Sequence, residues 1–251
     1  MVNIKLENVT FIRNNRRILD DVTLEFPAGK TSVVIGPSGC GKSTLLKIAA
    51  GLIPPSSGKV YVNGVNLLTM TKKQLLAFRK RSGFVFQDAA LWANKSVYDN
   101  MSLPLQVHYP DMEADEKDNR IREMLNAVGY TDSILLRPAQ LSNGERKMVS
   151  LARALVISPS LLYMDTPLTL VDPSVSAKMQ RLILNLHTSD STIIANFSDP
   201  ALTKQISDFT VVMKDGRVIS TGTIAEISSN KDKEISDTVS AVLYHQSDNS
   251  V

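Results

Sequence analysis

The sequence has few of the residues that build disulfide frameworks, metal clusters and membrane spans. Its 251 residues include one cysteine, three histidines and one tryptophan, and 28 lysines and arginines nearly balance 25 aspartates and glutamates. A single cysteine excludes an internal disulfide framework. No run approaches the roughly 20 apolar residues that a membrane-spanning helix needs. The formal charge of +3 is too small to argue for a nucleic-acid partner.

The rest of the composition is that of a folded protein with a substantial core. Hydrophobic residues make up 43% of the chain and charged residues 21%, with 12 glycines and 11 prolines. These values lie outside the disordered and collagen-like classes, and the length suggests one or two domains. The N-terminal residues 1–10 alternate polar and apolar side chains instead of forming a signal-peptide core, so we expect a cytoplasmic protein.

Short apolar runs of strand length recur along the chain. They comprise residues 4–11, 22–26, 32–35, 60–62, 83–86, 161–164, 192–195, 210–213 and 218–220. The runs 161–164 and 192–195 are continuously apolar, as expected of parallel strands covered on both faces. The runs near the two ends alternate and are joined by turn signals, which predicts antiparallel strands at the periphery of the sheet.

Apolar side chains recur with helical spacing at residues 121–128, 148–155 and 175–186. Strand signals disappear between residues 88 and 140, which predicts a helical subdomain, at about 88–158, inserted into a core that ends near residue 225. Residues 226–251 are polar apart from one amphipathic stretch, and we expect a C-terminal helix and a polar tail there. The expected fold class is α/β, with a mostly parallel sheet, a peripheral antiparallel β-subdomain and the inserted helices.

A phosphate-binding motif occupies residues 36–44, GPSGCGKST, which fit the pattern G-x-x-x-x-G-K-[ST]. The motif follows an apolar run and opens a helical pattern, which is the context it requires. Its glycines let backbone N–H groups close around a phosphate, Lys42 reaches the terminal phosphates, and the Ser43 hydroxyl can hold Mg²⁺. We therefore predict a nucleotide site formed by Ser38, Gly39, Cys40, Gly41, Lys42, Ser43 and Thr44. Cys40 is interpreted as a small filler and not as a redox centre.

Four further motifs follow in a fixed order. Residues 84–87, FVFQ, are similar to a Q-loop, and residues 141–145, LSNGE, resemble the LSGGQ signature. Residues 161–165, LLYMD, resemble a Walker B strand, and residues 169–172, TLVD, occupy the D-loop position. Together with the phosphate-binding motif, they make the chain resemble the ATP-binding cassette (ABC) family over nearly its whole length. The resemblance implies a P-loop NTPase core and ATP with Mg²⁺ as ligands.

The resemblance also assigns roles to individual residues. Ser43, Gln87 and Asp165 would hold Mg²⁺, and Gln87 would also sense the permease. Asp172 would belong to the D-loop. The signature acts on the γ-phosphate held by a partner subunit, and its residues here are Ser142, Asn143, Gly144 and Glu145. The resemblance therefore implies a second ABC cassette, in a homodimer or a heterodimer, with two ATP molecules between the subunits.

The sequence departs from the family pattern at two catalytic positions. The general base of the family is a Glu directly after the Walker B Asp, and Thr166 stands there. The switch His of the family falls at Ser198. A neutral hydroxyl can orient water but cannot accept its proton at physiological pH, and loss of a general base typically costs ~10²–10⁴-fold in rate. In the signature, Asn143 replaces Gly and Glu145 replaces Gln.

Three interpretations of these substitutions remain open. The chain is a weakly hydrolysing subunit paired with an active cassette, or it is a homodimer that hydrolyses ATP slowly. In the homodimer, the chemistry would be substrate-assisted, or Asp172 or Asp199 would help to position water. In the third interpretation it is a regulatory ATP-binding module that never turns over. A soluble ABC protein serving translation or DNA repair is a poorer fit, because it would need paired cassettes or a long coiled-coil insertion within 251 residues.

Two segments indicate how the chain recognises adenine and a permease. Arg13 occupies the position from which a Tyr stacks on adenine in many ABC proteins, and a guanidinium can also stack on a base. Residues 87–105, with Trp92 and Tyr98, resemble cassettes of Mla/Mce-type lipid transport. The resemblance implies a phospholipid or another hydrophobic cargo, and a separate membrane permease that docks in an apolar groove near Trp92 and Tyr98. The chain would then lie on the inner face of the cell membrane.

Overall fold

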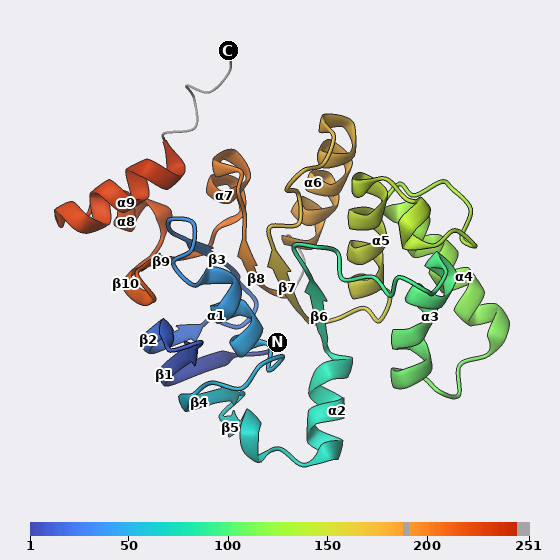
Figure 1. Cartoon of the computed structure of the whole chain (residues 1–251), viewed down its shortest axis with the longest axis horizontal. Helices are drawn as coiled ribbons and strands as arrows, with labels where there is room; N and C mark the ends of the chain where they lie inside the picture. The colour runs from blue at the N-terminus through green and yellow to red at the C-terminus, as the bar shows by residue number, and fades with distance from the viewer. Residues whose placement is uncertain (188–190, 245–251) are drawn as a thin grey trace.

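The computed structural model in Figure 1 describes residues 1–187 and 191–244, and these form two sheets with helices around them. The larger sheet has the strand order β10-β9-β3-β8-β7-β6. Strands β6 to β9 and β3 run parallel, and β10 pairs antiparallel with β9. The strands are β3 (Thr31–Ile35), β6 (Ser82–Val85), β7 (Leu161–Asp165), β8 (Thr192–Asn196), β9 (Phe209–Lys214) and β10 (Arg217–Gly222).

The smaller sheet is antiparallel and has the order β2-β1-β4-β5. Its strands are β1 (Ile4–Arg13), β2 (Arg16–Phe26), β4 (Ser57–Val62) and β5 (Val65–Asn66). Asn14 and Asn15 join β1 to β2 with φ angles of 51° and 58°. Asparagine tolerates this left-handed conformation, which the tight turn of a hairpin requires.

Helices cover the larger sheet and extend to one side of it. They are α1 (Lys42–Ala49), α2 (Lys72–Lys80), α3 (Val97–His108), α4 (Ala114–Ala127), α5 (Asn143–Leu155), α6 (Pro173–His187), α7 (Pro200–Ile206), α8 (Ile224–Ser228) and α9 (Lys233–Leu243), with 3₁₀ turns at Leu67–Thr69 and Pro138–Gln140. In Figure 1, α3, α4 and α5 gather beyond β6, whereas α8 and α9 lie beyond the opposite edge.

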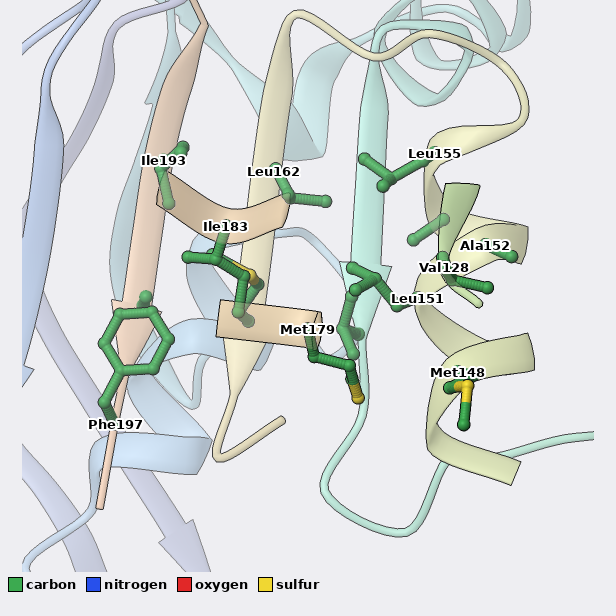
Figure 2. Close-up of a cluster of buried hydrophobic side chains, with 14 of the residues drawn as sticks. Val128, Met148, Leu151, Ala152, Leu155, Leu162, Met179, Ile183, Ile193 and Phe197 are labelled. Carbon is green, nitrogen blue, oxygen red and sulfur yellow. The ribbon is translucent and has the colours of Figure 1, made fainter. Parts of the chain in front are cut away.

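Two hydrophobic clusters enclose the larger sheet, one on each face. Leu162 and Met164 of β7 belong to the first cluster, and Leu161 and Tyr163 belong to the second. Figure 2 shows the first, where Met179 and Ile183 of α6 meet the strands. In the second, the buried Tyr163 hydroxyl donates to the Ala49 carbonyl at 2.9 Å and so fastens β7 to α1. Burial on both faces explains why β7 and β8 are continuously apolar.

The expected fold class is confirmed, and the differences concern peripheral elements. Strand β2 begins at Arg16 instead of residue 22, because its exposed first residues lie at the edge of the sheet and carry no apolar pattern. Helix α2 was not expected, because Phe78 is its one buried residue. The structure does not test the predicted domain boundaries, and residues 245–251 of the predicted C-terminal helix and polar tail (226–251) fall outside the described residues.

None of the helices in the described ranges combines the length and the apolar character that crossing a membrane would require.

Candidate nucleotide-binding site

A cavity of about 640 Å³ opens where the carboxyl ends of β3, β7 and β8 meet. In α/β folds this edge of the sheet is where ligands bind. The cavity is lined by Ile18, Ile35, Gly36, Pro37, Ser38, Gly39, Gly41, Lys42, Ser43, Thr44, Gln87, Thr166, Thr169, Asn196, Phe197, Ser198, Ala241 and Val242. Most of the residues predicted to bind ATP are therefore brought together at one place.

The loop between β3 and α1 is shaped to hold phosphate. Gly39 has a φ of 78°, and a side chain added there would project into open space, so a ligand can approach the backbone closely. The Lys42 ammonium donates to the carbonyls of Gly36 and Pro37 at 2.7 and 2.8 Å, which places its charge at the mouth of the loop. Helix α1 begins there with no side-chain cap. Its first N–H groups and its dipole therefore favour an anion.

Beside the cavity, at the ends of β7 and β8, oxygen ligands come together around the buried Asp165. The Ser43 hydroxyl donates to Asp165 Oδ1 at 2.9 Å, and the Asn196 side chain donates to the same oxygen at 3.2 Å. Asp165 is only 1% exposed, so these bonds fix the orientation of its carboxylate. A hydroxyl and a carboxylate fit Mg²⁺, which takes few protein ligands and is completed by phosphate oxygens and water. Ser43 and Asp165 would hold the ion.

Thr166 and Ser198, which the sequence resemblance aligns with two catalytic positions of the family, both line this cavity. Thr166 has a φ of 42°, and its N–H donates to the Asn196 carbonyl at 2.8 Å. Its hydroxyl oxygen is buried and has no hydrogen-bond partner within the described part of the chain. The Ser198 hydroxyl lies 3.1 Å from that of Thr169. These groups can hydrogen-bond to water or phosphate, but neither side chain can accept a proton at neutral pH.

Asp199, considered as a helper in hydrolysis, is engaged in the structure of α7. One carboxylate oxygen accepts from the N–H groups of Ala201 and Leu202, at 2.8 and 3.2 Å, and caps the helix. The other accepts from the Gln180 side chain at 3.0 Å. Asp172 is exposed just before α6, and its carbonyl accepts from the Ser176 N–H at 2.8 Å. Neither carboxylate lines the cavity.

The signature residues form the start of α5 and are not among the residues that line the phosphate-loop cavity. Ser142 caps the helix, and its N–H donates to the Glu145 carboxylate at 2.6 Å. The Asn143 side chain donates to the Leu170 carbonyl at 2.8 Å. A hydrogen bond with Asp132 and the bonds to Ser142 lower the pKa of Glu145. None of residues 142–145, Gly144 included, lines the cavity, so the signature does not meet the phosphate loop of its own chain.

Helix α5 holds the Q-loop through three polar side chains that sequence reasoning missed. The Lys147 ammonium donates to the Gln87 carbonyl and, at 3.5 Å, to the Thr166 carbonyl. The Ser150 hydroxyl donates to the Ala89 carbonyl at 2.8 Å, and Arg153 donates to the carbonyl of Ala90 at 2.8 Å. Burial lowers the pKa of Lys147, which is 3% exposed. The available signal was the spacing of polar residues on the otherwise apolar face of α5.

Four other residues singled out from the sequence do not line the cavity. Arg13 is exposed at the turn between β1 and β2, and Ile18 of β2 reaches the cavity instead. Cys40 is 5% exposed beneath the loop, and burial raises the pKa of its thiol, as expected of a small filler. Trp92 is 51% exposed, whereas Tyr98 is half-buried against the first hydrophobic cluster.

The sequence matches the family described as ABC transporter over residues 19–169, which is more than half of the chain. The chain belongs to the ABC transporter family. It is 31% identical over 233 residues to the intermembrane phospholipid transport system ATP-binding protein MlaF of Escherichia coli (strain K12), covering 92% of this chain and 86% of MlaF. It is 34% identical over 237 residues to the methionine import ATP-binding protein MetN of Mannheimia succiniciproducens, covering 92% of this chain and 68% of MetN.

A solved ABC cassette has the same fold. The dimeric post-hydrolysis structure of the ATP-binding cassette MJ0796, bound to ADP and Pi, superposes with a TM-score of 0.80 and 28% identity. The match covers 88% of this chain and 98% of MJ0796. The family and the fold inferred from the five motifs are thus confirmed, and the chain is the ATP-binding subunit of an ABC transporter.

Proposed function

We propose that this subunit binds ATP with Mg²⁺, hydrolyses it slowly, and works with a second cassette to drive a separate membrane permease. The proposal is supported by a contrast between the residues that would bind ATP and those that would serve its hydrolysis. The phosphate loop and the Ser43–Asp165 pair are complete, whereas Thr166 and Ser198 replace the two groups that serve hydrolysis in the family. Bound Mg²⁺ would neutralise negative charge on the phosphate oxygens.

Slow hydrolysis follows from the chemistry of Thr166. Thr166 lines the cavity that would hold the γ-phosphate, and its buried hydroxyl oxygen has no hydrogen-bond partner among the described residues. It can orient a water molecule, but the proton of that water then has no carboxylate to receive it. Asp199 does not supply one, because both its oxygens are used by α7 and Gln180. The phosphate itself, or solvent, would have to take the proton.

A second cassette is needed because the two halves of an ATP site are separated within one chain. Ser142 and Asn143 begin α5 outside the cavity that the phosphate loop lines. MJ0796, which shares the fold, is dimeric in its ADP-bound structure. We infer that the signature of one subunit meets the phosphate loop of the other, in a dimer of two copies or of this chain with a relative.

The permease-docking surface is proposed around Trp92. The backbone there is fixed, since the Trp92 N–H donates to Asn100 Oδ1 at 2.8 Å while the side chain remains 51% exposed. A large apolar side chain displayed on an ordered turn suits a helix of a partner protein. Phospholipid, or another hydrophobic molecule, is the proposed cargo because MlaF belongs to a phospholipid transport system. The subunit would then sit on the cytoplasmic face of the membrane.

Isolation of the tagged chain from a detergent extract, with the bound proteins identified by mass spectrometry, tests this function. We expect an integral-membrane permease and a cassette to co-purify, and Trp92→Asp to release the permease while ATP affinity is unchanged. Leu52→Asp is the matched control, because Leu52 is 45% exposed and lies just after α1. It should retain the permease.

Other outcomes separate the alternatives. A purely soluble partner would contradict the transport role. A complex in which the second cassette hydrolyses ATP and this chain only binds it would favour a regulatory subunit. Loss of ATP binding in Trp92→Asp would show that Trp92 supports the core instead of a partner surface.

A further inference from the structure

Lys147 is a buried cation that the mechanism above does not use. It lies on α5, is 3% exposed, and donates to two main-chain carbonyls, those of Gln87 and Thr166. No ion pair within the described residues includes it. A buried ammonium without a carboxylate partner is costly, because its charge loses hydration that neutral carbonyls only partly replace.

The position of Lys147 connects this charge to the nucleotide cavity. Both residues that accept its hydrogen bonds, Gln87 and Thr166, line that cavity. The carboxylates that act on Lys147 through space are Asp88 and Asp165, and Asp165 would face Mg²⁺. The charge therefore stands directly behind the wall at which the terminal phosphates and the metal would meet.

Two further cations lie beside this wall, together with one carboxylate. Lys147 also lines a second cavity, of about 530 Å³, together with Lys47, Arg146 and Asp88. Thr166 contributes no negative charge where the family has Glu. A fixed positive charge in a poorly hydrated wall attracts a polyphosphate and repels a divalent cation, and burial reduces its screening by solvent.

We propose that Lys147 is a positioning residue that also acts as a resident cation of the nucleotide site. It holds the Q-loop against the peptide that follows the Walker B strand, and its charge replaces part of the attraction that Mg²⁺ provides for the terminal phosphates. The proposal rests on the ATP binding described above. ATP should accordingly bind this chain with an unusually weak dependence on Mg²⁺.

The test compares ATP binding by the wild type and two variants, in EDTA and at increasing Mg²⁺, by isothermal titration calorimetry. Lys147→Gln keeps a hydrogen-bond donor but removes the charge, and Lys147→Arg keeps the charge. We expect Lys147→Gln to weaken ATP binding in EDTA by about tenfold. This is the effect of removing one unit charge about 10 Å from the phosphates at the effective dielectric constant of a protein. Its ATP complex should bind Mg²⁺ more tightly, whereas Lys147→Arg should behave as the wild type.

Weaker ATP binding in EDTA together with tighter Mg²⁺ binding distinguishes an effect of charge from a loss of structure. Loss of structure would weaken ATP binding by the same factor in both media, and that result, or no change in either medium, would overturn the proposal. Ser150→Ala is the control, because it removes a hydrogen bond between the same helix and the Q-loop without changing charge. If Lys147→Gln does not fold, Lys147→Met fills the buried space and replaces it. Failure of the wild type to bind ATP at all would instead contradict the proposed function.

Discussion

Thr166 combines a β-branched side chain with a left-handed backbone, at a φ of 42°. A β-branched residue is an outlier there, and such strain costs of the order of 1–3 kcal/mol. The conformation turns the chain sharply out of β7, so that residue 166 lies against the cavity with its hydroxyl oxygen buried. The backbone thus places residue 166 at the cavity, where Thr offers a hydroxyl and no carboxylate.

Introducing Glu at position 166 and His at position 198 directly tests the proposed effect of these two positions on hydrolysis. Thr166→Glu should raise the steady-state rate of ATP hydrolysis by ~10²–10⁴-fold, because it supplies a general base. Adding Ser198→His should increase the rate further, whereas Ser198→His alone should change little because no base is present. Phosphate release under saturating Mg-ATP measures these rates. If Thr166→Glu gives no gain, other parts of the site are also unfit for hydrolysis.

The residues of the site differ in how far the sequence could predict them. Residues 36–44 are contiguous, so spacing alone predicted that Lys42 and Ser43 would lie together in one loop, and both line the cavity. The contact between Lys147 and Gln87 joins residues 60 positions apart, and no local pattern indicates which carbonyl a buried lysine will reach. Ile18 was not predicted, because Arg13, earlier in the same hairpin, offered the more recognisable chemistry for stacking on a base.

Among the elements, α7 decides how Asp199 is interpreted. The helix is short, and the Asp199 carboxylate satisfies two of its first N–H groups. An aspartate in this position with both oxygens engaged is a helix cap. Its replacement should lower the stability of the fold and leave catalysis unchanged.

Substitution of Asp199 separates the two roles. Asp199→Ala should lower the free energy of unfolding by about 0.5–2 kcal/mol, whereas Asp199→Asn, which also caps helices, should cost little. Neither change should alter the rate of hydrolysis per folded molecule. Urea unfolding and the ATPase assay measure the two effects. A fall of more than about tenfold in the Asp199→Asn rate would instead show that the carboxylate takes part in the reaction.

Elements with a continuous or repeating apolar pattern were predictable, as the helices α4 and α6 also show, whereas an element with a single buried side chain was not. The unbroken apolar runs of β7 and β8 predicted both strands. Helix α2 has one buried side chain, and its clearest signal was the capping box of Thr71 and Gln74. Helix α3 contains Pro104, which breaks the expected helical pattern although the helix continues through it.

At the scale of the whole molecule, the proposal holds that the chain contains the two halves of an ATP site without joining them. The phosphate loop opens at the carboxyl edge of the larger sheet, and the signature begins α5 on the side where the helices gather. Such a chain would bind nucleotide through its own loop, and a second cassette would complete the γ-phosphate contacts. Binding energy can then drive association of subunits even when the bond to the γ-phosphate is broken slowly.

The most direct test of this account measures ATP affinity and steady-state turnover on the same purified preparation, with and without the co-purified partners. We predict saturable binding of Mg-ATP together with turnover by this chain's own site below about 1 s⁻¹, under the usual enzyme range. The contribution of the partner cassette is removed by inactivating its own Walker B glutamate. Turnover above about 1 s⁻¹ from the site that contains Thr166 would contradict the account.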